Sequence, residues 1–213
     1  MGRGNFITFE GGDGTGKSTQ IARLETRLKD RGLLTVTTRE PGGSPGAEQI
    51  RKLLLTGDLG RWDETSEALL FSAARRNHVE TLIKPALKVG NWVLCDRFSD
   101  STMAYQGIAG GMGRDLINTL NHQAIGDFEP DLTLVLDLPY EEGLKRSGAR
   151  TAGDQDPEDR FERKGEEFHG KLRLAFLEIA ALNPNRCQII DATGSEQEVG
   201  ARIWKCVEGK FFS

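Results

Sequence analysis

The sequence predicts an α/β fold in which a five-stranded parallel sheet carries helices on both faces. Short apolar runs alternate with longer segments of helical periodicity along the chain, which is the order of a repeated strand–helix unit. The runs are mostly apolar throughout rather than at every second residue, as expected for strands that helices cover on both sides. Many of the 26 glycines fall between these segments, where loops should lie.

Each predicted strand is a short run rich in apolar or β-branched side chains. The fourth is the most continuous, with Leu132, Leu134, Val135 and Leu136 close together. The third run ends at Asp96. The strands are predicted over residues 5–10, 33–38, 92–95, 132–137 and 187–190.

Helices are predicted where apolar residues recur every three or four positions. In the first helix, Ile21, Leu24 and Leu28 share one face. The third is long, and Pro85 should kink it. The helix that starts at residue 141 is expected to end at Arg146, where a polar stretch begins. The predicted helices cover residues 17–31, 46–55, 65–89, 114–125, 141–146, 161–182 and 197–211.

The carboxyl ends of the strands are where a ligand is expected, because open parallel sheets bind their ligands in crevices there. Four of the five loops that leave these ends carry distinctive residues. The chemistry should therefore lie just after the strand ends, which are Glu10, Thr38, Asp96, Asp137 and Asp191.

The composition excludes several classes of protein. The chain has 213 residues, of which 37% are hydrophobic and 28% charged, and is predicted to be one globular domain over residues 1–213. A net charge of −4 argues against a general nucleic-acid or membrane surface, and no apolar run has the length of a membrane span. Three distant cysteines without metal-ligand spacing favour the reducing cytoplasm, and Cys95 should be a core residue.

The loop after the first strand matches G-x-x-x-x-G-K-[ST], the phosphate-binding P-loop. Its glycines let backbone N–H groups converge on a phosphate, and the helix that follows adds its positive end. Lys17 should neutralise the β- and γ-phosphates, and Ser18 should offer its hydroxyl to Mg²⁺. The prediction is a three-layer P-loop NTPase fold, and the motif by itself leaves a kinase, an ATPase and a GTPase open. The residues concerned are Gly11, Gly12, Asp13, Gly14, Thr15, Gly16, Lys17 and Ser18.

A nucleotide kinase needs further cations for its acceptor and must keep water out of the reaction. Arg39 follows the second strand and Arg97 the third, so both stand at the ligand edge of the sheet. Arg97 can clamp a phosphate through two N–H groups. Asp96 stands where a P-loop protein keeps the carboxylate on its Mg²⁺ side, usually through water.

Two further segments are candidates for a nucleobase site. Phe71 and Arg75 are four residues apart on a predicted helix and so share a face, where a ring can stack on a base and a guanidinium can bind its edge. Their spacing alone favours an ordinary core aromatic beside a solvated arginine. Thr102, Tyr105 and Gln106 offer hydrogen bonds and a second ring, and they too could be structural.

The segment at about residues 147–160 is polar, poor in apolar residues and bounded by helices, which is typical of a mobile lid. Arg146, Arg150 and Arg160 could swing over the phosphates from it. A solvated loop is the alternative, because mixed charge usually indicates one.

The order of these motifs resembles the bacterial thymidylate kinase family from Phe6 to about Trp204. The resemblance implies transfer of the γ-phosphoryl of ATP to dTMP, giving dTDP and ADP in dTTP biosynthesis. It also implies Mg²⁺ and a homodimer packed through long helices. The motifs that carry it are the P-loop, Arg39-Glu40-Pro41-Gly42-Gly43, Phe71 to Arg75, Asp96-Arg97-Phe98, Tyr105-Gln106-Gly107, Pro130-Asp131-Leu132-Thr133, Leu144-Lys145-Arg146, Asp159-Arg160-Phe161-Glu162 and Asp191-Ala192-Thr193.

Roles for the acceptor site come from this resemblance. It implies that Phe71 stacks on thymine, that Arg75 bonds the carbonyl edge of the base and that Thr102 contacts the other edge. Tyr105 would crowd the 2′ position of the sugar and so favour deoxyribose. Gln106 is expected to belong to the same substrate site.

The family resemblance also implies roles for residues around the phosphates. Arg39 and Arg97 would hold the dTMP phosphate, and Asp13 would approach the sugar 3′-hydroxyl or the metal shell. Arg146 would lie near adenine, with the loop of Thr193 bordering it.

The resemblance also implies a catalytic arginine, whose guanidinium would neutralise charge on the transferring phosphoryl group. Some members of the family carry an arginine directly after the Asp of the P-loop, where this chain has Gly14. Members without it supply the guanidinium from the lid, which makes Arg150 the first choice here and Arg160 the alternative. With Lys17, Asp13 and Arg97, Arg150 completes the predicted catalytic set.

Two other functions stay open at this point. Another P-loop kinase could act on dUMP, CMP or a nucleoside. The chain could instead be a GTPase switch or a regulatory ATPase, although a GTPase would need the guanine-binding sequence Asn-Lys-x-Asp, which this chain lacks.

Overall fold

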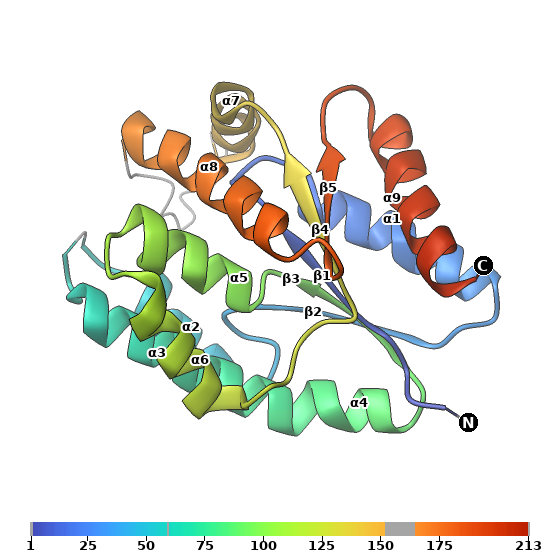
Figure 1. The fold of residues 1–213 in the computed structure, drawn as a ribbon, viewed down its shortest axis with the longest axis horizontal. Helices are drawn as coiled ribbons and strands as arrows, with labels where there is room; N and C mark the ends of the chain where they lie inside the picture. The colour runs from blue at the N-terminus through green and yellow to red at the C-terminus, as the bar shows by residue number, and fades with distance from the viewer. Residues whose placement is uncertain (1, 59, 152–164, 213) are drawn as a thin grey trace.

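The computed structural model describes residues 2–58, 60–151 and 165–212. Five parallel strands form one sheet in the order β2-β3-β1-β4-β5, with β1 at its centre (Figure 1). This confirms the predicted sheet, and the second strand lies one to two residues further along the chain than predicted. The strands are β1 (Phe6–Glu10), β2 (Thr35–Arg39), β3 (Trp92–Asp96), β4 (Leu132–Asp137) and β5 (Cys187–Asp191).

Helices cover both faces of the sheet, which accounts for the apolar strands. On one face, Ile7 and Phe9 of β1 belong to a buried cluster with α1 (Lys17–Asp30) and α9 (Glu196–Phe211). Phe6, the residue before Ile7, points the other way and belongs to a second cluster on the opposite face. Because successive side chains of a strand point to opposite faces, β1 needs apolar residues at consecutive positions.

The opposite face carries the remaining long helices (Figure 1). The predicted helix over residues 114–125 is confirmed residue for residue as α6 (Arg114–Ile125). The predicted segment 65–89 is helical as far as Lys88. It is interrupted by a π-helical turn that ends at Ile83, two residues before Pro85. Proline lacks an N–H, so it disturbs the helical turn before it. The other elements are α2 (Pro45–Leu55), α3 (Glu64–His78), η1 (Val79–Ile83), α4 (Lys84–Lys88), α5 (Ser99–Thr102), η2 (Met103–Ala109), α7 (Tyr140–Thr151) and α8 (Glu166–Leu182).

One helical segment was not predicted, and the predicted end of one helix was wrong. The segment 99–109 is helical, as α5 and η2, although it was not predicted to be, and contacts from elsewhere in the chain fix it: the Arg186 guanidinium binds the Asp100 carboxylate at 2.6 Å. Helix α7 does not end at Arg146 but continues to Thr151, because Ser147 is buried against the rest of the protein. The start of the predicted lid is therefore helical, and the rest of it lies outside the described residues.

The cysteine expectation is confirmed for Cys95, whose side chain is fully buried in the cluster of Phe6 and Phe98. Burial raises the pKa of its thiol well above the usual value. None of the described helices is long and apolar enough to cross a membrane.

Candidate active site

The P-loop curls between β1 and α1. Gly11, Gly14 and Gly16 all adopt positive φ, a backbone region that other residues rarely occupy. Lys17 is buried in the curl, and its Nζ donates to the carbonyl oxygens of Gly11 and Gly12 at 3.1 and 2.8 Å. Burial, and next the charge of Arg97, lowers the pKa of Lys17 to about 8. The loop has the turn and the cation that phosphate binding requires.

Gly14 is in direct backbone contact with helix α7. A Cβ placed on Gly14 would lie 1.9 Å from the carbonyl oxygen of Gly143, and the φ of Gly14 is 71°. No side chain fits there without moving α7. An arginine at this position, which the family resemblance raised as a possibility, is therefore excluded by packing in this chain.

Ser18 and Asp96 form the candidate Mg²⁺ position. The Ser18 hydroxyl donates to Asp96 Oδ2 at 2.9 Å, which brings the first turn of α1 to the end of β3. In the described part of the chain, no group of three or more His, Cys, Asp or Glu side chains could hold a metal by itself. One hydroxyl and one carboxylate suit Mg²⁺, which usually keeps waters and binds substrate phosphates beside few protein ligands.

A cavity of about 230 Å³ lies beside the P-loop and brings together six of the seven predicted substrate residues. Its walls come from the P-loop, from helices α2 and α3, from the loop after β2 and from the segment that follows β3. It is lined by Asp13, Glu40, Pro41, Arg51, Leu55, Phe71, Arg75, Arg97, Phe98, Ser101, Thr102, Tyr105 and Gln106.

Arg39 is the predicted substrate residue that the structure does not bring into this cavity. Its side chain is exposed, lines a separate hollow beside Ser18 and Asp96, and lies 3.4 Å from Glu48. Neighbouring residues of a strand point to opposite faces, so a strand end alone does not decide which hollow an arginine reaches. Arg51 of α2 lines the cavity instead and donates to the Pro41 carbonyl at 2.6 Å. Arg51 was not singled out from the sequence, where it looks like an ordinary charged residue of a helix.

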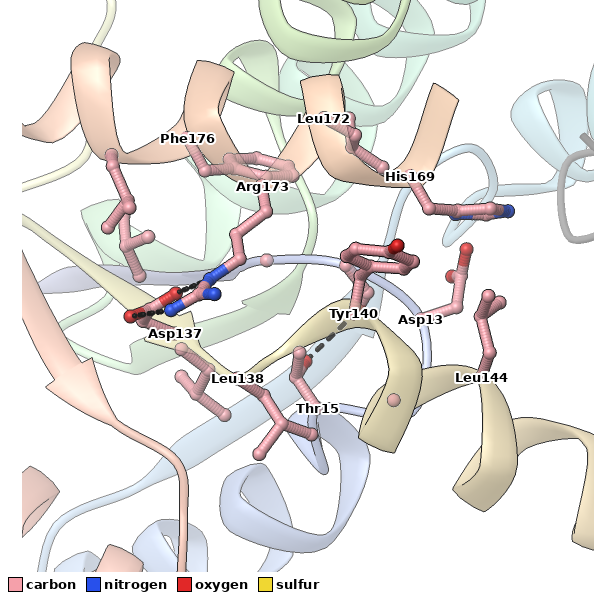
Figure 2. Close-up of a pocket in the computed structure, with 16 residues that line it drawn as sticks. Asp13, Thr15, Asp137, Leu138, Tyr140, Leu144, His169, Leu172, Arg173 and Phe176 are labelled. Atoms are coloured by element: carbon pink, nitrogen blue, oxygen red, sulfur yellow. Dashed lines mark hydrogen bonds and ion pairs between the residues drawn. The ribbon is translucent and has the colours of Figure 1, made fainter. Parts of the chain in front are cut away.

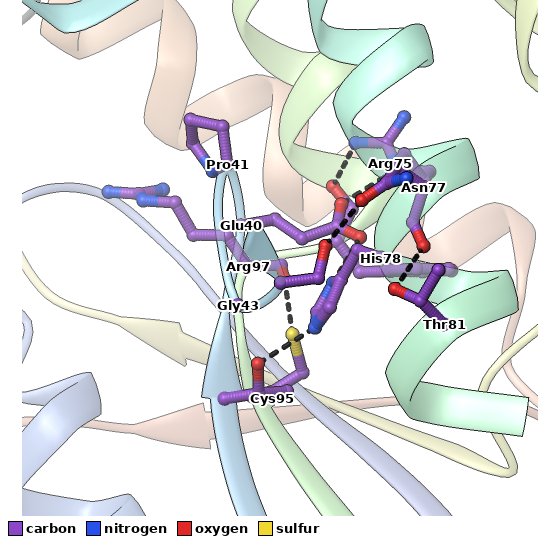
Figure 3. A network of polar contacts seen from close by, with 12 residues as sticks. Glu40, Pro41, Gly43, Arg75, Asn77, His78, Thr81, Cys95 and Arg97 are labelled. Atoms are coloured by element: carbon purple, nitrogen blue, oxygen red, sulfur yellow. Dashed lines mark hydrogen bonds and ion pairs between the residues drawn. The ribbon is translucent and has the colours of Figure 1, made fainter. Parts of the chain in front are cut away.

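Arg75 is locked in place by a buried network (Figure 3). Its Nε donates to Glu40 Oε2 at 2.8 Å, and Glu40 Oε1 lies 3.0 Å from Nδ1 of His78. The other nitrogens of Arg75 donate to Asn121 and to the Thr102 hydroxyl, each at 2.8 Å, and to the carbonyl of Phe98. A guanidinium held on so many sides presents a fixed edge to the cavity. Glu40 and His78 were not singled out from the sequence, because their partners lie far away along the chain.

Asp13 joins the P-loop to the cavity. Its Oδ1 accepts from Arg97 at 2.7 Å and its Oδ2 accepts from the Tyr105 hydroxyl at 3.2 Å. Burial by itself would raise the pKa of Asp13, but the charges of Arg97 and Lys17 outweigh it and lower that pKa. The pKa of Tyr105 is raised, first by burial, so its hydroxyl stays protonated and can donate. The structure thus brings Asp13 of the P-loop into contact with two residues of the cavity, Arg97 and Tyr105.

Gln106 lines the same cavity from η2. Its Nε2 donates to Glu67 Oε1 at 2.7 Å, and both side chains are buried. Because the amide nitrogen is occupied in this way, the orientation of the amide is defined. The π-helical turn that carries Tyr105 and Gln106 is a form often found at functional sites.

A second, smaller cavity of about 20 Å³ lies between the P-loop and α8 (Figure 2). In Figure 2 the Asp13 carboxylate points toward the ring of His169, a buried residue of α8. Arg173 of the same helix binds Asp137 at 2.6 and 3.0 Å. His169 and Arg173 were not predicted from the sequence, where they look like ordinary residues of a long helix.

The two residues predicted near adenine, Arg146 and Thr193, line neither of these two cavities. Arg146 pairs with Glu142 one turn earlier on α7. The N–H and the hydroxyl of Thr193 both donate to Asp191, at 2.9 and 2.7 Å. Arg150 lies in the last turn of α7, and Arg160 lies outside the described residues.

Comparison with known proteins finds one family. A family model described as "Thymidylate kinase" matches residues 9–203. Proteins named "Thymidylate kinase" are similar along almost the whole chain. That of Afipia carboxidovorans is 53% identical, and the match covers 100% of this chain and 92% of the relative. That of Rhodopseudomonas palustris is 56% identical, and the match covers 96% of this chain and 89% of the relative. A crystal structure of thymidylate kinase from Ehrlichia chaffeensis superposes with a TM-score of 0.77 at 34% identity, covering 96% of this chain and 99% of the other.

Proposed function

The chain belongs to the thymidylate kinase family, and from this premise we propose how its residues divide the work of ATP-dependent dTMP phosphorylation. The enzyme transfers the γ-phosphoryl of ATP to dTMP, giving dTDP and ADP for dTTP synthesis. We propose that residues 1–213 act as one kinase domain in the cytoplasm. The assignments rest on one observation: Asp13 of the P-loop and Arg97 of the acceptor cavity are joined by a 2.7 Å ion pair.

ATP is proposed to bind through the P-loop, with the backbone N–H groups of residues 11–18 around its phosphates and Lys17 neutralising their charge. Ser18 and Asp96 would hold Mg²⁺, the latter usually through water, and the ion would screen the charge of the phosphates. Arg146 and Thr193 would border the adenine.

The acceptor dTMP is proposed to occupy the 230 Å³ cavity. Phe71 stacks on thymine, while Arg75, Thr102 and Gln106 bind the edges of the base. Tyr105 packs against the deoxyribose at its 2′ position, where a hydroxyl would be crowded.

The dTMP phosphate is held by Arg97 and, in place of Arg39, by Arg51, because Arg51 and not Arg39 lines the cavity. An oxygen of this phosphate attacks the γ-phosphorus in line, without a covalent enzyme intermediate. The oxygen is already anionic, so no strong general base is needed. Catalysis then consists of positioning and charge stabilisation by Lys17, Arg97 and a lid arginine, with Arg150 as first choice.

Steady-state kinetics over dTMP, dUMP, dCMP and thymidine test this assignment. We expect kcat/KM to be highest for dTMP, and at least about 10²-fold lower for dCMP, whose amino group would face the N–H of Arg75 Nη1 that is not used within the network. Thymidine should be a poor substrate because it lacks the phosphate that Arg97 holds. A clear preference for dCMP or thymidine would contradict the proposed site.

A homodimer is proposed to form through α2, α3 and α6. Each of these helices carries an exposed leucine: Leu53 is 41% exposed, Leu69 50% and Leu116 41%. Apolar side chains on neighbouring exposed helices suit a self-complementary interface.

The double variant Leu69→Glu and Leu116→Glu is expected to be monomeric by light scattering at micromolar concentration, because both charges would be buried at the interface. Ile189→Glu is the matched control and should leave the molar mass unchanged, because Ile189 is 50% exposed, like Leu69, and lies on the edge strand β5 rather than on α2, α3 or α6. A wild-type protein with the molar mass of one chain would rule the dimer out.

A further inference from the structure

Glu10, the last residue of β1, is a buried carboxyl group without a role in the mechanism above. Its side chain is fully buried. Its Oε1 accepts from the N–H of Phe98 at 2.7 Å, and its Oε2 accepts from the hydroxyl of Ser101 at 2.6 Å. Both oxygens therefore hold one short segment, the turn that carries Arg97 away from β3.

The backbone of Arg97 needs such support. Its φ is 68°, and it is the one residue other than glycine with a positive φ among those that the structure describes. An L residue persists in this region only where its surroundings hold it there. The Arg97 N–H donates to Phe9 at 2.9 Å, and the next N–H along the chain is the one that Glu10 accepts. Glu10 thus fixes the peptide directly after the disfavoured residue.

The side chain of Arg97 is tied to the same carboxyl group. Its Nη1 lies 3.3 Å from the Ser101 hydroxyl oxygen, which accepts from it and donates onward to Glu10. The same nitrogen donates to the Gly11 carbonyl, and Nη2 donates to Asp13. Through Ser101, Glu10 limits the positions that the Arg97 guanidinium can take.

We propose that Glu10 is a positioning residue, which holds Arg97 in the backbone and side-chain conformation that grips the acceptor phosphate. The proposal rests on the proposed function, in which Arg97 binds dTMP. Burial, and next the nearby charge of Asp100, raises the pKa of Glu10 to about 8. A neutral carboxyl group is thus accessible near pH 7, and glutamine has the same shape. Its Oε1 can accept from the Phe98 N–H and its Nε2 can donate to the Ser101 hydroxyl oxygen, so both contacts persist, the second with its direction reversed.

The dissociation constant for dTMP, measured by titration calorimetry, is the readout. We expect Glu10→Ala to weaken dTMP binding about 30-fold, because both links to Arg97 are lost, and Glu10→Gln to change it less than about threefold. Binding of ATP should change less than about threefold in both. Thr8→Val is the matched control, because Thr8 is equally buried on the same face of β1 and its hydroxyl is hydrogen-bonded to that of Thr133. Loss of this hydrogen bond should lower the melting temperature and leave dTMP binding unchanged.

A double-mutant cycle separates positioning from a general structural effect. If Glu10 acts through Arg97, Glu10→Ala should weaken dTMP binding less than about threefold in an Arg97→Ala background. A full 30-fold loss in that background would overturn the inference while leaving the proposed function intact. If Arg97→Ala alone leaves dTMP binding unchanged, the proposed role of Arg97 fails first.

Ser101→Ala keeps the test available if Glu10→Ala does not fold. This variant removes the side-chain link alone, so we expect about fivefold weaker dTMP binding in the wild-type background and no further loss beside Arg97→Ala. Equal losses in both backgrounds would overturn the inference.

Discussion

Replacing Lys17 by methionine is expected to lower kcat by about 10³-fold or more, while dTMP binding changes less than about threefold. Methionine has a similar length and fills the same buried space, so the loss isolates the charge. The pKa of Lys17, lowered to about 8 by burial, leaves the side chain mostly cationic at pH 7. Because charge shifts on the phosphoryl group during transfer, a cation fixed in a buried site stabilises the transition state more than the ground state.

Rapid-quench measurement of the single-turnover rate, together with calorimetric titration of dTMP, checks this expectation. Lys29→Met is the matched control, because Lys29 lies on the same helix but is exposed and paired with Glu25. It should behave as wild type. If Lys17→Met kept a kcat within tenfold of wild type, the P-loop lysine would not carry the charge of the transferred group.

The parts of the fold that local sequence determines could be predicted, and the parts that tertiary contacts determine could not. Helix α6 and strand β4 have the predicted bounds because their hydrophobic patterns are unambiguous. The helical segment 99–109 contains Asp100, Ser101 and Gly107, which favour helix weakly by themselves. Its shape depends on Arg186 and Glu10, residues far away in sequence.

The same distinction between local sequence and tertiary contacts explains which residues of the candidate site could be predicted. Sequence motifs located the P-loop and the residues after β3, because a strand followed by a fixed motif defines a place on the sheet edge. The direction that a side chain takes from that place depends on packing, which the motifs do not specify. Arg39 was therefore expected at the acceptor site, but its side chain lines a separate hollow and Arg51 lines the cavity instead. The partners of Arg75, above all Glu40, required the folded chain to be recognised.

The backbone contact between Gly14 and Gly143 limits where a catalytic arginine can stand. A side chain at position 14 would meet the carbonyl oxygen of Gly143, and a Cβ on Gly143 would lie 2.5 Å from the carbonyl oxygen of Asp13. Helix α7 thus rests on the P-loop backbone to backbone. In the proposed mechanism, the guanidinium that stabilises the transferring phosphoryl group would therefore come from another segment, and α7 leads from this contact toward the predicted lid.

Arg150→Ala is therefore expected to lower kcat about 10³-fold, the scale of an arginine that neutralises a transferring phosphoryl group. Binding of dTMP should change less than about threefold, because the acceptor phosphate is proposed to be held by Arg97 and Arg51 and not by Arg150. Lys145→Ala, at an exposed position of the same helix, is the control and should keep wild-type turnover. If Arg150→Ala turned over normally and Arg160→Ala did not, the transition-state charge would be met by Arg160, from the part of the lid beyond α7.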